Sequence, residues 1–228
     1  MTLAICFRCD ADNRLGYGHL ARCLTLAQES TRRNLDAIFV LREQDERAHR
    51  EVARQQFEIV TSRIDDTGTE LLEAWPGRVP VVLDMAHRVA MARKGYLDDL
   101  IRDLRDSGRK TVLLDSMGED AAAVRIAEHV DMVISPYLGA ESGPPPRASR
   151  WLSGAQYVVL PPAFQSPITP RTRQVGKLML VTMGGADPWH LTEMTLESLE
   201  SLRNANWSIR VVAGLFFSRE RVEALRKR

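Results

Sequence analysis

A histidine at the end of a glycine-containing loop is the residue of this 228-residue chain best placed to do chemistry. The run G-Y-G-H, which ends at His19, follows an apolar segment (residues 3–7) that predicts a buried strand, and it leads into a helix beginning near His19. The glycines allow the backbone to approach a ligand closely. The free amides of a helix N-terminus suit a phosphate or a sugar oxygen, and the positive end of the helix dipole favours a neutral imidazole there. A neutral imidazole can serve as a general base.

Other interpretations of this loop remain open. A loop between a strand and a helix can carry two glycines for turning alone, and His19 could hydrogen-bond the helix end without catalysing anything. The spacing is not G-x-G-x-x-G, which disfavours a dinucleotide site. Asp10 and Asp12 flank the loop and could bind substrate amides or hydroxyls, although loop aspartates often only cap turns.

Composition excludes several classes of protein. Hydrophobic residues make up 44% and charged residues 27%, as in an ordinary globular protein. With 31 basic and 30 acidic residues, the net charge of +1 points to neither nucleic acid nor a membrane surface as a partner. No apolar stretch approaches the ~18 residues of a membrane span, and the N-terminus does not read as a signal peptide. We therefore expect a cytoplasmic protein.

Three cysteines argue against a disulfide framework. Cys6 and Cys9 have the C-x-x-C spacing of redox and zinc sites. However, residues three apart in a strand point to opposite faces, a redox pair normally sits at a helix N-terminus, and no second cysteine pair could complete a zinc site. We predict that these cysteines are core or loop residues.

Beyond the first loop, strand and helix signals alternate, which predicts an α/β fold with a parallel, doubly wound sheet and right-handed crossovers. Strands are expected at residues 36–41, 57–60, 79–83, 111–114 and 132–134, and helices at 44–56 and 94–107. Two of the strands end on Asp84 and Asp115, at the carboxyl edge where ligands bind in such sheets. The proline-rich residues 139–150 read as a surface loop or flap.

The second half reads as a separate α/β unit. We expect a Rossmann-like domain over 1–160, a proline-rich linker over 161–176 and part of a nucleotide-binding domain over 177–228. In this unit, Asp187 suits a helix N-cap and Pro188 the first helical position. Its expected elements are strands at 177–182 and 208–213 and helices at 191–202 and 219–228. At ~52 residues the unit is near the size at which a domain is marginal alone, so we expect the chain to end inside a domain.

Three segments carry a resemblance to a known family. They are residues 8–27, which contain D-N-R-L-G-Y-G-H, residues 151–164, which read W-L-S-G-A-Q-Y-V-V-L-P-P-A-F, and residues 180–192, which contain T-M-G-G-A-D-P. In this order they resemble the UDP-sugar hydrolase family of pseudaminic acid biosynthesis, which has the two-domain GT-B fold of nucleotide-sugar glycosyltransferases. The resemblance extends from Ile5 to about Leu202, and its first and third segments are the most specific.

The resemblance implies hydrolysis of UDP-2,4-diacetamido-2,4,6-trideoxy-β-L-altropyranose to the free sugar and UDP, with neither a metal nor another cofactor. His19 would activate the water that attacks the anomeric carbon. The nucleotide would lie beside Gly184, Gly185 and Asp187. The residues expected to contact the substrate are Arg8, Asp10, Gly16, Tyr17, Gly18, Arg22, Asp84 and His87. UDP is already a good leaving group, so it needs N–H donors and cations rather than a strong acid.

The chain departs from the family pattern at three places. No tyrosine follows Asp84, where His87 could substitute or lie on the surface, and Asp115 is followed by Ser116 instead of a second aspartate. The family's uracil- and ribose-binding elements would lie beyond Arg228. We therefore expect a fragment, a unit completed by a second chain, or a protein that has lost catalysis. Alone, the chain should bind UDP weakly, hydrolyse the sugar nucleotide poorly or not at all, and expose an apolar flank.

Two further functions remain as alternatives. A non-catalytic nucleotide-sugar-binding or scaffold subunit would use the same site without turnover. A GT-B glycosyltransferase would pass the sugar to an acceptor instead of to water. Release of free sugar without any acceptor separates the hydrolase from both.

Overall fold

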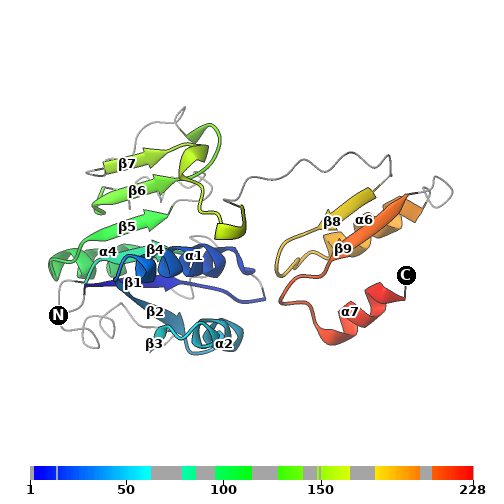
Figure 1. Cartoon of the computed structure of the whole chain (residues 1–228), viewed down its shortest axis with the longest axis horizontal. Helices are drawn as coiled ribbons and strands as arrows, with labels where there is room; N and C mark the ends of the chain where they lie inside the picture. The colour runs from blue at the N-terminus through cyan, green and yellow to red at the C-terminus, as the bar shows by residue number, and fades with distance from the viewer. Residues whose placement is uncertain are drawn as a thin grey trace.

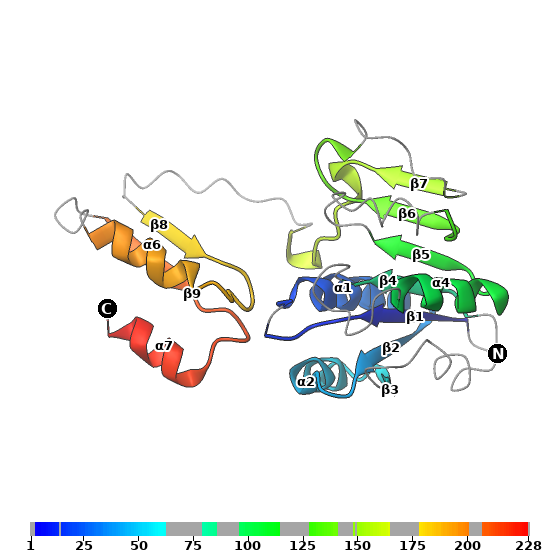
Figure 2. The ribbon, with the colours of Figure 1, turned by 180° about the vertical axis from the view of Figure 1, so that it is seen from behind.

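The computed structural model describes residues 3–13, 15–62, 79–85, 96–114, 128–140, 148, 150–164, 178–200 and 207–227. The strands in this part of the chain form two separate sheets (Figures 1 and 2). The larger sheet has seven parallel strands in the order β3-β2-β1-β4-β5-β6-β7, and the smaller pairs β8 with β9, also in parallel. The expected parallel α/β architecture is confirmed.

The elements of the two sheets follow one another along the chain. The strands of the large sheet are β1 (Ala4–Cys9), β2 (Asp36–Arg42), β3 (Glu58–Ser62), β4 (Val81–Asp84), β5 (Thr111–Leu114), β6 (Met132–Ser135) and β7 (Arg150–Ser153). Beside it the structure describes the helices α1 (Gly18–Arg32), α2 (Glu46–Arg54) and α4 (Tyr96–Asp106) and the 3-10 turns η2 (Ala155–Tyr157) and η3 (Pro162–Phe164). The second unit comprises β8 (Leu178–Thr182), α6 (Leu191–Leu199), β9 (Ser208–Val212) and α7 (Arg219–Arg226).

The large sheet buries an apolar core on each of its faces. Alternate residues of a strand point to opposite faces, so Phe7 and Cys9 pack under α1 and α2, whereas Cys6 packs under α4. Phe7 and Phe39 stack with ring centroids 5.4 Å apart in the first of these clusters. All three cysteines are free and buried, which agrees with the core or loop position expected for Cys6 and Cys9, and burial raises the pKa of Cys6 to about 12.

The strand order reverses direction between β1 and β4. From β1 the chain passes through α1 to β2 on one side, whereas β4 lies on the other side and leads through α4 to β5. The crevice at the carboxyl ends of two such strands is where open α/β sheets bind ligands. Cys9, the last residue of β1, is paired with Asp84, the last residue of β4, so both strands end at the same level.

Some element boundaries differ from those expected. Arg150, the last residue of the expected flap, begins the edge strand β7, which was not predicted, and the Trp151 indole donates a hydrogen bond to Ser135 Oγ at 3.1 Å. Helix α6 begins at Leu191, as expected, but its N-cap residue is His190 rather than Asp187, which has a φ of 44°, and Pro188 lies outside the helix. The chain from 141 to 147 and from 165 to 177, and with it most of the expected flap and linker, lies outside the described residues.

No described helix combines the length and apolarity needed to cross a bilayer.

Candidate active site

Helix α1 presents an open N-terminus at the switch point of the large sheet. Tyr17 is its N-cap residue, and among the described residues no side chain caps the first turn, which also contains no acidic residue. Leu20 and Leu24 bury one side of the helix against the sheet, so the register of α1 is fixed by the core. His19, in the first turn, is thereby held beside the carboxyl ends of β1 and β4.

His19 contacts a carboxylate from the neighbouring strand. Its Nδ1 atom lies 2.7 Å from Oδ1 of Asp84, whose side chain is wholly buried. Arg22 grips the same carboxylate in bidentate fashion: Nε donates to Oδ2 and Nη2 donates to Oδ1, both at 2.8 Å. A buried carboxylate requires a compensating charge and hydrogen bonds, and Arg22 supplies both. Burial lowers the pKa of Arg22, but the hydrogen bonds and charge of Asp84 outweigh it and leave that pKa raised.

A second set of charged side chains holds the loop that carries the glycines. Arg8 and Asp10 are almost fully buried and are joined at 2.7 Å, and Arg42 bridges Asp10 and Asp12 at 3.2 and 3.0 Å. Asp12 also accepts a hydrogen bond from the Leu15 amide at 2.7 Å, as an aspartate that caps a turn does. These ion pairs hold the first residues of the loop in place. Gly16, at a φ of 79°, then turns the backbone toward α1.

The twin-glycine loop of the second unit turns its amides toward the first loop. The Gly185 carbonyl accepts a hydrogen bond from the Phe216 amide at 2.9 Å, and Gly214 lies so close to the carbonyls of Gly184 and Gly185 that it has no room for a side chain. In a trans peptide the N–H points opposite to the C=O. The amides of Gly185 and Ala186 therefore face the other way, where their nitrogens lie 4.0 and 3.8 Å from the Cβ position of Gly16.

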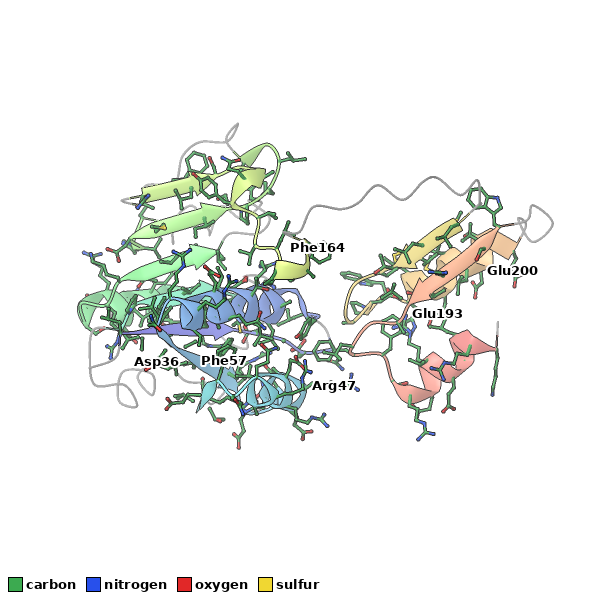
Figure 3. All side chains as sticks on the ribbon, viewed as in Figure 1. Asp36, Arg47, Phe57, Phe164, Glu193 and Glu200 are labelled. Atoms are coloured by element: carbon green, nitrogen blue, oxygen red, sulfur yellow. The ribbon has the colours of Figure 1, made fainter. Side chains whose placement is uncertain are left out.

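The two loops are in contact. A Cβ atom added at Gly185 would lie 2.9 Å from the backbone nitrogen of Tyr17, so only glycine fits there without displacement. Arg47 of α2, labelled in Figure 3, donates a hydrogen bond to the Leu215 carbonyl and lies 5.6 Å from the ring centroid of Phe216. Phe216 itself packs against the core cluster that contains Phe7. The glycine loops of both units thus face one another beside His19.

The Asp187 carboxylate binds groups of the second unit itself. Its carboxylate accepts hydrogen bonds from the amides of Leu191 at 2.8 Å and Thr192 at 3.0 Å, and it pairs with Arg221 at 2.6 Å. Arg221 also binds Glu193 at 2.6 Å. Although burial alone would raise it, these hydrogen bonds lower the pKa of Asp187 to about 2. The first amides of α6 are therefore already satisfied by a side chain, in contrast to those of α1.

The structure brings together part of the expected site. His19, Arg22, Asp84, Gly16 and Gly185 meet around the N-terminus of α1, which begins at Gly18. No contact among the described residues places Gly184 against α1, and His87 lies outside the described residues. Arg8, Asp10 and Asp187 bind protein groups in this structure, so their contacts with a ligand stay predictions. Tyr17 is half-buried; burial first, and then the charge of Glu51, raises its pKa to about 12, so the phenol stays neutral.

Several important contacts were not predicted. The hydrogen bond between His19 and Asp84, the loop support by Arg42 and the clamp by Arg221 all join residues far apart in sequence. The only available signal was the spacing of His19 and Arg22, which places both on one side of a helix. Within the described part of the chain, no group of three or more His, Cys, Asp or Glu residues is arranged to hold a metal. Catalysis without a metal stays a prediction.

Comparisons with known proteins show the fold. No protein-family model matches the chain. It is 21% identical over 220 residues to the uncharacterized protein MJ1062 of Methanocaldococcus jannaschii, an alignment that covers 92% of this chain and 42% of that protein. The chain thus spans less than half the length of the curated relative it matches. The crystal structure of MurG from Acinetobacter baumannii aligns with 97% of this chain and 70% of its own, with a TM-score of 0.56 and 10% identity. The chain has the GT-B-like α/β fold expected from its sequence.

Proposed function

We propose that this chain binds a UDP-linked diacetamido-trideoxy sugar and hydrolyses it, with His19 as the general base. The observation that carries the proposal is the placement of His19: Nδ1 lies against buried Asp84, while Nε2 has no hydrogen-bond partner among the described residues. The imidazole stands in the first turn of a helix whose amides no described side chain caps. A base with one nitrogen anchored and the other available is the arrangement that proton abstraction from water requires.

In the proposed reaction, Nε2 of His19 takes a proton from a water molecule while the water oxygen attacks the anomeric carbon. The bond from that carbon to the β-phosphate oxygen breaks, and UDP leaves with its electron pair. The products are the free sugar and UDP, and the histidine returns its proton to solvent. No strong general acid is needed, because the diphosphate is a stable anion.

The backbone supports the departing charge from two sides. The free amides of α1 and the amides of Gly185 and Ala186 face the same region, and adjacent N–H groups of this kind bind phosphate oxygens. Helix α6 contributes less than expected from the sequence, because Asp187 already occupies the amides of Leu191 and Thr192. The diphosphate site is therefore proposed between the two glycine loops, which must separate to admit it.

The substrate class rests on the sequence motifs together with the fold. The G-Y-G-H and twin-glycine segments, which resemble the hydrolase family, are the two loops that the structure places in contact. A GT-B-like fold is the architecture in which that family handles nucleotide sugars. The identity of the sugar comes from the resemblance alone and is part of the proposal.

A product assay tests the proposal. The purified chain is incubated with millimolar UDP-2,4-diacetamido-2,4,6-trideoxy-β-L-altropyranose and no acceptor, so that weak binding does not hide turnover, and UDP and free sugar are followed by NMR. We expect slow release of both products, reduced about 10²–10⁴-fold in His19→Asn with UDP affinity retained. His129→Asn is the matched control, because His129 is exposed and lies before the amino end of β6, whereas His19 lies at the carboxyl ends of the strands. Equal losses of binding and turnover in His19→Asn would indicate a structural role instead.

A further inference from the structure

We infer that Asp84, clamped by Arg22, fixes the tautomer of His19 so that the proton resides on Nδ1 and the lone pair on Nε2. Asp84 is in this sense a positioning residue, not a group that touches substrate. The effect on catalysis rests on the proposed function. The position of the proton on His19 follows from the contacts of His19, Arg22 and Asp84 alone.

The distances decide between two hydrogen-bond arrangements. Nδ1 of His19 lies 2.7 Å from Asp84 Oδ1 and 3.0 Å from Arg22 Nη2. If Nδ1 carried no proton, its lone pair would face a carboxylate oxygen at 2.7 Å, which is repulsive. A proton on Nδ1 turns the shorter contact into a charge-assisted hydrogen bond, which is the shortest class of N–H···O bond. Arg22 Nη2 then donates to Asp84 Oδ1, which is also its nearer neighbour at 2.8 Å.

Arg22 keeps the acceptor in place. It occupies both oxygens of Asp84, Oδ2 through Nε and Oδ1 through Nη2, so the carboxylate cannot rotate without breaking a bond to the guanidinium. The side chain of Asp84 is wholly buried, so water does not compete for these positions. Among the described residues, Oδ1 accepts from His19 and Arg22 and Oδ2 accepts from Arg22, and burial of the carboxylate keeps a substrate hydroxyl away from the lone pair that remains on Oδ2. This assigns Asp84 a different role from the substrate contact expected from the sequence.

The arrangement has a consequence for the reaction. With Nδ1–H donated to a carboxylate, the neutral imidazole presents Nε2 as its basic atom, and the imidazolium formed after proton transfer keeps the same hydrogen bond to Asp84. Without the Asp84 carboxylate, the imidazole proton is no longer held on Nδ1. Molecules in which Nε2 carries the proton cannot take a proton from water at that atom. Asp84 should therefore affect kcat rather than the affinity for UDP.

The test reads the tautomer directly. In the 15N-labelled full chain, two-bond 1H–15N correlations of the imidazole report which nitrogen of His19 carries the proton. We expect Nδ1–H in the wild type and a mixed or Nε2–H state in Asp84→Asn, with kcat about 10²–10⁴-fold lower and UDP affinity unchanged. Asp36→Asn, an exposed aspartate at the start of β2 (Figure 3), should alter neither readout.

The outcomes separate this inference from the proposed function. A proton on Nε2 in the wild type, or an unchanged tautomer and kcat in Asp84→Asn, overturns the inference even if the chain hydrolyses the sugar nucleotide. An Asp84-dependent Nδ1–H in a chain that releases no UDP supports the inference and rejects the hydrolase. If Asp84→Asn does not fold, the wild-type spectrum and that of Arg22→Lys, which retains the charge but not the bidentate grip, decide the question.

Discussion

His19 and Asp84 stand 65 positions apart in the chain, yet their side chains meet at 2.7 Å because β1 and β4 are neighbours in the sheet. The residue that joins them is Arg22, one helical turn beyond His19. The imidazole of His19 is partly exposed, whereas the carboxylate of Asp84 is fully buried. The stability of the pair therefore depends on a cation that compensates the charge of Asp84.

Replacing Arg22 should destabilise the fold as well as the site. Arg22→Gln leaves the buried Asp84 carboxylate without its cation, and we expect the free energy of unfolding to fall by about 3 kcal/mol. Arg32→Gln is the matched control on the same helix, because its exposed pairing with Glu29 contributes little to stability. Urea unfolding followed by circular dichroism measures both. Equal stabilities of the two variants would mean that the guanidinium of Arg22 does not compensate Asp84.

The contact between the two glycine loops makes a steric prediction. In Gly185→Ala, the new methyl group would lie 2.9 Å from the backbone nitrogen of Tyr17, so it projects into the space between the loops where the diphosphate is proposed to bind. We expect affinity for UDP to fall about tenfold, which corresponds to about 1.4 kcal/mol. Gly139→Ala is the control for loop strain without a steric clash: its φ of 82° disfavours alanine, but no described atom lies within 4 Å of the Cβ position. NMR titration with UDP compares the variants, and unchanged affinity in Gly185→Ala would place the diphosphate elsewhere.

Asp187 predicts how stability depends on pH. Its pKa is about 2 in the folded chain and about 3.9 when unfolded, so the unfolded state binds the proton more readily in acid. The stabilisation of about 2 kcal/mol is fully present above pH ~4 and is lost as the pH falls toward ~2. Asp187→Asn should therefore unfold more easily than the wild type at pH 7, with a difference that shrinks as the pH is lowered through this window. Urea unfolding at several pH values measures it; a pH-independent difference would show that the charge of Asp187 is not the cause.

Much of the fold could be predicted because each long element carries its own periodicity. Buried apolar runs identified β1, β2 and β4, and the alternation with helices implied a parallel sheet. Strand β7 escaped prediction because its four residues, Arg150 to Ser153, show no alternation and follow a proline-rich segment. The first residue of α6 was predicted, but its capping was not, because Asp187 accepts the Leu191 amide from four residues upstream and has a φ of 44° that sequence does not reveal.

The site was predictable only as a collection of residues. His19 and Asp84 were both selected, since one ends a glycine loop and the other ends a strand. Their hydrogen bond depends on which strands are neighbours, and the grip of Arg22 depends on side-chain geometry. The clamp by Arg221 requires α7 to lie against α6, which no local pattern encodes.

The central claim is that His19 directs water to the anomeric carbon, and the position of the broken bond tests it most directly. Hydrolysis in H2(18)O with the wild-type chain at millimolar UDP-sugar places the label according to the atom that water attacks. The account predicts UDP without 18O in its β-phosphate, as shown by mass spectrometry, together with His19-dependent release of free sugar. Label in the β-phosphate would mean attack at phosphorus, and the role assigned to His19 would be wrong.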